Sequence, residues 1–95
     1  MAIEKPTSFT DPKVIEAIRQ EPCAACGKRP VDPDHIKTRG AGGGDLWENL
    51  MPLCRKHHIE RHSCGYVFMA RYYPGVKSAL ERKGWRITPT GLERR

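Results

Sequence analysis

The sequence predicts a small α+β protein that folds as one domain over residues 1–95. Three observations lead to this prediction: a capped helical pattern near the N-terminus, two short extended segments, and cysteine and histidine pairs that could join them through a metal ion. The hydrophobic fraction of 38% is low for an unaided core of this size. We therefore expect a metal ion to stabilise the fold.

The first expected element is a helix over residues 11–20. Thr10 or Asp11 can cap it, and Pro12 suits its first turn, where no N–H group is needed. Its apolar side comprises Val14, Ile15 and Ile18. Pro22 ends the pattern, immediately before the segment CAACGK.

Two short strands are expected next. Prolines bracket an extended piece around Val31 to Ile36, and the segment LWENLMPL is expected to supply the second strand. Between the two strands, four of the five residues 40–44 are glycines, which predicts a loop without regular structure.

The second half of the chain is expected to be helical. The absence of Gly and Pro from Arg55 to His62 permits a helix, and further helical turns are expected over residues 65–84, with Gly84 as the terminator. The tail ITPTGLERR is expected to be loosely held.

The net charge, the N-terminal residues and the cysteine content indicate which class of protein to expect. Seventeen Lys and Arg against eleven Asp and Glu give a net charge of +6, which favours a nucleic-acid partner over charge that only keeps the protein soluble. No apolar run approaches a membrane span, and MAIEKPTSF lacks the apolar core of a signal peptide. We expect a cytoplasmic protein with no membrane partner, in which four cysteines favour metal or redox chemistry over disulfides.

The cysteines and one histidine form a pattern typical of structural zinc. Cys23 and Cys26 make a C-x-x-C pair, and the later C-x-x-H pair ends the group, which comprises Cys23, Cys26, Cys54 and His57. Three thiolates and an imidazole match a closed tetrahedral zinc site, the alternative being a reduced cysteine pair beside a surface histidine. Cys64 belongs to no pair and is expected to be a small core residue or a free thiol.

The segment PLCRKHHIERH suggests a second metal centre. Adjacent helical residues differ by about 100° in direction, so His57 and His58 should serve different ions, while His58 and His62 share one helical face. Asp34 in PDHI offers an oxygen ligand. Because neighbouring side chains of a strand face opposite sides, one of Asp34 and His35 can bind metal while the other accepts a proton from water.

The order C-x-x-C, DHI, GGG and ENLMPLC-x-x-HH-x-x-x-H resembles the zinc-stapled His–Asn–His (HNH) nucleases of the ββα-metal class. In that family two short antiparallel strands and a helix clasp a divalent ion. The resemblance covers residues 23–62 and leaves helical flanks at 11–20 and 65–84. The segment HSCGYVFMARYYPG is similar to phage-associated members of the group.

The resemblance implies a role for each residue of the second centre. His35 would be the general base that activates water, and Asn49 would orient the His35 ring through a hydrogen bond. Asp34, His58 and His62 would hold the catalytic ion, for which Mg²⁺, Mn²⁺, Ni²⁺ and Zn²⁺ all remain open. Three basic residues are expected to contact DNA phosphates: Lys37, Arg39 and Arg61.

The sequence therefore predicts a metal-dependent DNA endonuclease that hydrolyses phosphodiester bonds and nicks or cuts double-stranded DNA with low sequence specificity. A homodimer or a targeting partner is left open. The main alternative is a non-catalytic zinc module that binds nucleic acid, which would leave five residues without a role: Asp34, His35, Asn49, His58 and His62. A thiol-redox protein is disfavoured because no βαβ pattern surrounds CAAC.

Overall fold

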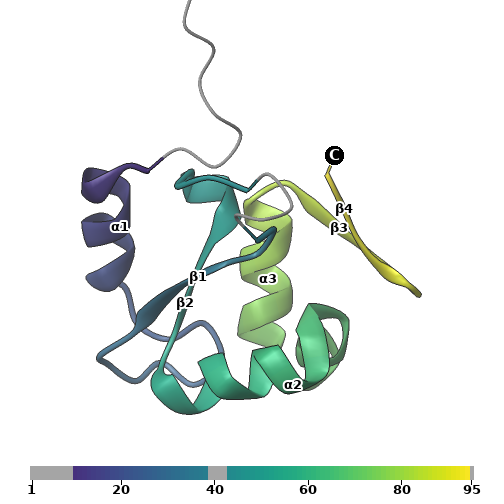
Figure 1. Cartoon of the computed structure of the whole chain (residues 1–95). Helices are drawn as coiled ribbons and strands as arrows, with labels where there is room; N and C mark the ends of the chain where they lie inside the picture. Colours follow the sequence, from purple (N-terminus) through teal and green to yellow (C-terminus); the bar gives the residue numbers. More distant parts are fainter. Residues whose placement is uncertain (1–9, 39–42, 95) are drawn as a thin grey trace, which may run out of the picture.

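The computed structural model describes residues 10–38 and 43–94 (Figure 1). In chain order the elements are α1 (Pro12–Arg19), β1 (Asp32–His35), the 3₁₀ helix η2 (Trp47–Asn49), β2 (Leu50–Leu53), α2 (Arg55–Tyr72), α3 (Pro74–Arg82), β3 (Trp85–Thr88) and β4 (Gly91–Arg94). This mixture of helices with two small sheets confirms the α+β prediction. Among the described helices, none has the length and apolar character needed to cross a membrane.

Helix α1 forms where its capping signals predict it. The Asp11 side chain accepts a hydrogen bond from the backbone N–H of Lys13, and Pro12 occupies the first helical position. Ile18 points inward and is fully buried. At the other end, the Arg29 guanidinium donates two hydrogen bonds to the Gln20 carbonyl, which would otherwise be unsatisfied at the helix end.

Strands β1 and β2 pair antiparallel, with Asp34 opposite Met51 and His35 opposite Leu50. The second strand is shorter than the sequence predicted. Residues 47–49 of LWENLMPL form η2 instead, and the Asn49 N–H bonds to the Leu46 carbonyl to close that turn. The turn brings Asn49 to the start of β2, next to the paired strand.

Helix α2 joins the helix expected at Arg55 to His62 to the helical turns that follow it. The two parts meet at Gly65, whose φ of 81° and ψ of 167° interrupt the helical backbone. Positive φ is readily adopted by glycine, because it has no Cβ. The kink lets the second part of α2 direct Tyr66, Met69 and Ala70 into the core.

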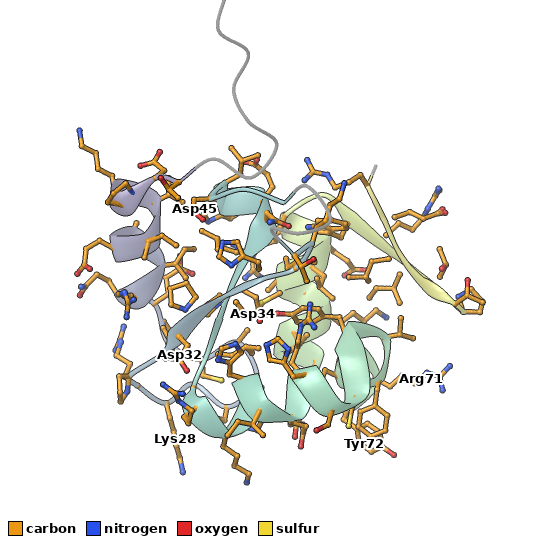
Figure 2. All side chains as sticks on the ribbon, viewed as in Figure 1. Lys28, Asp32, Asp34, Asp45, Arg71 and Tyr72 are labelled. Carbon is orange, nitrogen blue, oxygen red and sulfur yellow. The ribbon has the colours of Figure 1, made fainter. Side chains whose placement is uncertain are left out.

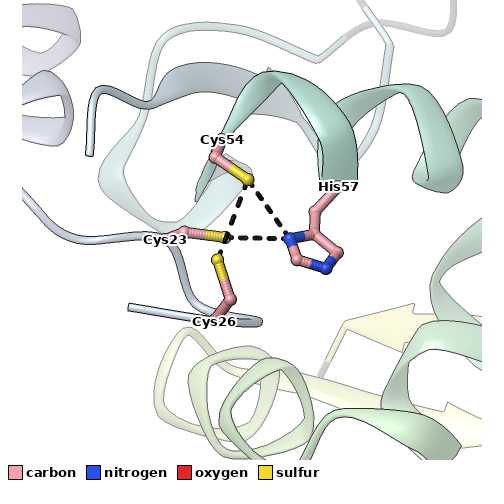
Figure 3. Close-up of side chains that lie close together, drawn as sticks. All are labelled: Cys23, Cys26, Cys54 and His57. Carbon is pink, nitrogen blue, oxygen red and sulfur yellow. Dashed lines mark hydrogen bonds between the residues drawn. The ribbon is translucent and has the colours of Figure 1, made fainter. Parts of the chain in front are cut away.

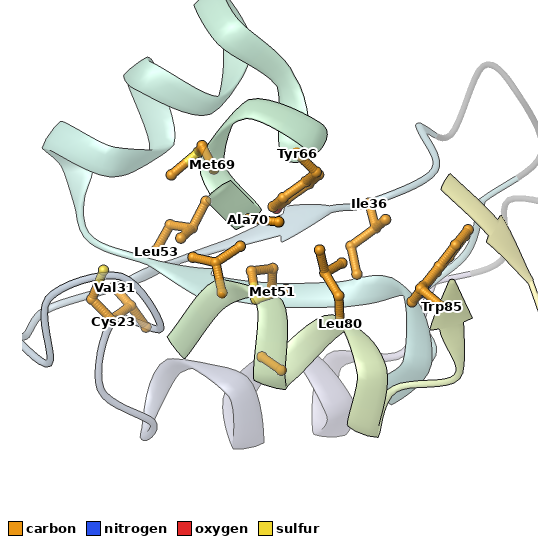
Figure 4. Packing of buried hydrophobic residues seen from close by; sticks show 12 residues of the cluster. Cys23, Val31, Ile36, Met51, Leu53, Tyr66, Met69, Ala70, Leu80 and Trp85 are labelled. Carbon is orange, nitrogen blue, oxygen red and sulfur yellow. The ribbon is translucent and has the colours of Figure 1, made fainter. Parts of the chain in front are cut away.

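The core lies where β2, the second part of α2 and α3 meet (Figure 4). Met51, Leu53 and Leu80 are fully buried there. In Figure 1 the β1–β2 ribbon runs between α1 and α3, and α2 crosses one end of it. This packing fixes the ribbon against α2, from which the candidate site is built.

The C-terminal segment is a β-hairpin, so the prediction of a loosely held tail is wrong as far as Arg94. Strands β3 and β4 pair antiparallel, and the Thr88 hydroxyl exchanges hydrogen bonds with the backbone of Gly91 across the turn. Trp85 is buried, and its indole N–H donates to the Glu48 carbonyl at 2.6 Å. The hairpin is therefore anchored to η2 at its base.

Candidate active site

The predicted zinc ligands come together in one cluster, which comprises Cys23, Cys26, Cys54 and His57 (Figure 3). The Cys26 and Cys54 sulfurs are 3.8 Å apart, and His57 Nδ1 lies 3.2 Å from Cys54 Sγ and 3.6 Å from Cys23 Sγ. With Zn–S bonds of about 2.3 Å, tetrahedral sulfur ligands stand roughly 3.8 Å apart. The donor set and its spacing therefore fit a closed zinc site.

Two chain segments position this cluster. Cys23 and Cys26 lie in a tight turn after α1, closed by a bond from the Gly27 N–H to the Cys23 carbonyl. Cys54 caps α2, and His57 lies in the first turn of that helix. A metal ion held here would join the end of α1 to the junction of β2 and α2.

The thiol of Cys23 is suited to bind a metal as a thiolate. Burial of Cys23 works against ionisation, but hydrogen bonds from the backbone of Cys54, Cys26 and Ala25 outweigh it and lower the pKa of Cys23. The His57 ring is buried and makes an edge contact with Tyr73 at 4.9 Å between ring centroids. This packing orients Nδ1 of His57 toward the sulfurs.

A second cluster joins β1 to α2. His58 Nε2 and His62 Nε2 lie 3.1 and 3.3 Å from Asp34 Oδ1, and the two nitrogens are 3.2 Å from each other. A ring N–H can point at only one of its two neighbours, so hydrogen bonds alone do not account for this triangle. A cation bound at about 2.1 Å by all three atoms would space them roughly 3.0–3.4 Å apart. The arrangement fits a divalent ion.

The other oxygen of Asp34 is occupied by protein groups. Arg61 Nε lies 2.9 Å from Asp34 Oδ2 as an ion pair, and the Tyr66 hydroxyl donates a hydrogen bond to the same oxygen. Burial, reinforced by the charge of Asp34, raises the pKa of Tyr66 well above its ordinary value, so the phenol stays protonated and donates. Asp34 is 3% exposed, and these contacts leave Oδ1 directed at the two histidines.

Arg61, for which the sequence predicts a phosphate contact, makes several contacts within the protein. Besides its ion pair with Asp34, its guanidinium donates to the carbonyls of His35 and Ile36, and it stacks over the Tyr66 ring at 4.7 Å. These contacts direct the guanidinium inward. Arg61 compensates the buried charge of Asp34 rather than facing solvent.

The ring of His58 is held from its far side. Its Nδ1 lies 3.1 Å from Asp32 Oδ2, while Nε2 points to Asp34. Asp32 also pairs with the exposed side chain of Arg55 at 3.1 Å. A carboxylate behind a ligating imidazole fixes the tautomer and the direction of the ring.

Replacing Asp32 with asparagine is therefore expected to weaken metal binding at this centre roughly 10- to 100-fold. Titration of zinc-loaded protein with Mn²⁺ by calorimetry would measure the change. Arg55→Gln is the matched control, because it removes the outer partner of Asp32 and leaves the carboxylate behind His58. Equal Mn²⁺ affinity in Asp32→Asn and in the control would show that Asp32 does not support the site.

The His35 side chain makes different contacts from that of its neighbour Asp34, although both line one cavity. Its Nε2 is 2.7 Å from Asp45 Oδ1, and its side chain is 21% exposed. Asp45 is 2% exposed, and its other oxygen accepts the backbone N–H of Asp11 at 2.8 Å. His35 therefore combines an anchored ring with access to solvent.

Asn49 does not make the expected hydrogen bond to the His35 ring among the described contacts. Its Oδ1 accepts from the Lys37 N–H at 2.8 Å, and its Nδ2 donates to the Lys37 and Gly44 carbonyls at 2.9 and 3.0 Å. Both amide hydrogens are thus used on backbone. A Cβ at Gly43 would overlap the Lys37 carbonyl and approach this amide, so the close loop crossing needs glycine.

One cavity of about 240 Å³ connects the second cluster with His35. Its lining comprises Pro33, Asp34, His35, Thr38, His58 and His62. Figure 2 shows Asp32, Asp34 and Asp45 following one another along the ribbon from α2 toward η2. The triangle of candidate metal ligands formed by Asp34, His58 and His62 (the metal-binding triangle) and a candidate base thus face the same space.

The sequence also led to expectations for Lys37, Arg39 and Cys64. Lys37 is exposed beside the cavity residue Thr38 and remains a candidate for phosphate contact. Arg39 lies outside the described residues. Cys64 is an exposed free cysteine, which agrees with a free thiol and not with a core residue.

Sequence reasoning missed three residues that contact the candidate site: Asp32, Asp45 and Tyr66. Asp32 had a usable signal, because it precedes Asp34 by two positions on one strand and so shares its face. Tyr66 lies beyond the Gly65 kink, where helical spacing from His62 no longer applies. Asp45 follows the glycine loop, and no spacing rule places it beside His35.

Comparison with known proteins agrees with this geometry. Residues 23–64 match the HNH endonuclease family. This segment is similar to HNH domains. The match spans both clusters of candidate metal ligands and His35.

A relative extends the similarity beyond the HNH domain. The chain is 35% identical over 77 residues to the uncharacterized protein YdfU of Escherichia coli strain K12. The aligned part is 76% of this chain but 22% of YdfU, so the chain spans a minor part of that relative's length. No solved structure matches the chain significantly.

Proposed function

We propose that the HNH domain is a metal-dependent endonuclease that hydrolyses phosphodiester bonds of double-stranded DNA. The observation that carries the proposal is the shared cavity, in which a metal-binding triangle and His35 face the same space. Hydrolysis needs an activated water and neutralised charge on the phosphate, and these two groups can supply them.

His35 acts on the attacking water. Its ring is exposed at the cavity while its other side is anchored, so it can take a proton from a water placed in line with the phosphorus. Asp34, His58 and His62 would hold a divalent ion, which would supply Lewis-acid stabilisation of charge on the departing 3′ oxygen. The expected products carry a 5′-phosphate and a 3′-hydroxyl.

The Cys₃His cluster is proposed to bind zinc and to stabilise the fold. It lies at the start of α2, next to His58 in the sequence. A zinc ion there would fix the helix that carries His58 and His62. All of its four protein ligands are present, which leaves no open coordination position for catalysis.

DNA binding is proposed to depend on charge more than on base reading. The chain carries a net charge of +6, and Lys37 is exposed near the cavity. Phosphate contacts add affinity without sequence information, so we propose low sequence specificity for this domain, with any targeting supplied by a second copy or another protein.

The competing zinc module that only binds nucleic acid is less well supported. It does not explain why Asp34 is buried with one oxygen tied down and the other aimed at two histidines. A buried charge of this kind is costly unless it is compensated, and the arrangement gives it a metal-binding use.

The test is cleavage of supercoiled plasmid by zinc-loaded protein. We expect nicked and linear products with added Mg²⁺ or Mn²⁺ and none after EDTA, with activity restored when the divalent ion is returned. Zinc content is measured after EDTA, so that loss of the structural ion is recognised. His35→Ala, purified in parallel, reports any contaminating nuclease. DNA binding without cleavage by any of Mg²⁺, Mn²⁺, Ni²⁺ or Zn²⁺ would favour the non-catalytic module.

A further inference from the structure

We propose that Asp45 is the positioning residue for His35, a role that rests on the proposed function. Its carboxylate accepts a hydrogen bond from the N–H group at Nε2 of the ring. Nδ1 is then the atom that takes the proton from water. In this proposal Asp45 acts through His35, the residue that its carboxylate contacts.

The first support is the contact itself. Asp45 Oδ1 and His35 Nε2 are 2.7 Å apart, the short distance typical of a charge-assisted hydrogen bond. A carboxylate can only accept, so in the neutral form of the His35 ring Nε2 is the protonated nitrogen. The lone pair then lies on Nδ1.

The second support is that both oxygens of Asp45 are fixed. Oδ2 accepts the backbone N–H of Asp11 at 2.8 Å, which ties the carboxylate to the start of α1. An acceptor role at both oxygens agrees with an ionised carboxylate. With 2% exposure the side chain has little freedom to turn, so its direction sets the plane of the His35 ring.

The third support is the backbone around Asp45. The Asn49 amide holds the Gly44 carbonyl, directly before Asp45, and also holds both backbone polar groups of Lys37, two residues after His35. Asn49 thus fixes the two chain segments that carry Asp45 and His35. The ring contact that the sequence assigned to Asn49 is made by Asp45.

The alternative is that Asp45 only links the loop to α1. Asp45→Asn separates the two roles, because the amide oxygen can still accept from Asp11 while the amide nitrogen faces His35. That nitrogen donates, which favours the tautomer with a bare Nε2 and a protonated Nδ1. A change of tautomer at preserved geometry is expected to reduce kcat on the order of 10²- to 10⁴-fold.

The experiment reads the tautomer directly. Zinc-loaded protein labelled with ¹⁵N in histidine is studied by long-range ¹H–¹⁵N correlation, with the His35 signals assigned by their loss in His35→Gln. We expect a protonated Nε2 in the wild type and a protonated Nδ1 in Asp45→Asn. Asp32→Asn is the matched control, since it should change His58 and leave His35 unchanged. Plasmid cleavage with Mn²⁺ and thermal melting are measured on the same samples.

The outcomes separate the two proposals. An unchanged His35 tautomer in folded Asp45→Asn, or a rate that falls only as far as the folded fraction does, overturns the role of Asp45. A tautomer change that accompanies a large loss of kcat at wild-type Mn²⁺ affinity supports it. If the tautomer changes but wild-type protein cuts no plasmid, positioning of the ring stands and the proposed nuclease function fails.

Discussion

Replacing His35 with alanine is expected to reduce plasmid cleavage by roughly two to four orders of magnitude. The ring is the candidate base at the cavity, and its removal leaves no other described imidazole there outside the metal-binding triangle. Asp34, His58 and His62 keep their own contacts in the variant, so metal binding should stay near the wild-type level. Initial cleavage rates at saturating Mn²⁺ measure the effect.

The comparison must be made at equal metal occupancy. Calorimetric titration with Mn²⁺ and a DNA-binding assay in Ca²⁺ establish that His35→Ala still binds both. Cys64→Ser is a suitable control, because Cys64 is exposed and belongs to neither cluster, and it should cleave like the wild type. A His35→Ala rate close to that of the control would rule out His35 as the base.

His57 and His58 are neighbours in sequence, but their alanine variants are expected to lose different properties: zinc binding and stability for His57, and DNA cleavage for His58. His57→Ala removes one ligand of the Cys₃His cluster and should cost the protein its zinc and much of its stability, because structural zinc contributes directly to folding. His57→Cys should be tolerated, since thiolate and imidazole are both normal fourth ligands. Elemental analysis and thermal melting measure both effects.

His58→Ala should reduce cleavage to background while the protein remains folded with one zinc ion. The His58 side chain contacts Asp34 and Asp32, and its one described bond to the cysteine cluster, from its backbone N–H to the Cys54 carbonyl, does not involve the imidazole. Its loss opens the metal-binding triangle and leaves Cys54 and His57 untouched. Zinc content, melting temperature and plasmid cleavage are compared across His57→Ala, His57→Cys and His58→Ala.

Two results would contradict the assignment of His57 and His58 to different metal sites. A folded, zinc-loaded His57→Ala beside an unfolded His58→Ala would reverse the roles of the two histidines. Loss of all metal from both variants would indicate a single shared centre, although the two groups of ligand atoms are separate in the structure.

The sequence by itself determined the elements whose causes are local. The Cys-x-x-Cys and Cys-x-x-His spacings brought the thiols and His57 within reach of one ion, and helical spacing placed His58 and His62 on one face. Asp11 and Pro12 determined the start of α1. The position of Asp34 beside His35 in β1 gave the two residues different expected roles. Each of these follows from the geometry of a few adjacent residues.

The tertiary structure decided which groups assist those ligands. Asp45 reaches His35 only because the chain returns after the glycine segment, and Arg61 turns inward only because the buried charge of Asp34 needs a counter-ion. The hairpin of β3 and β4 is held by Trp85 bonding to Glu48, a contact between residues 37 positions apart. Contacts of this kind depend on how separate elements pack, and spacing within one segment carries no information about them.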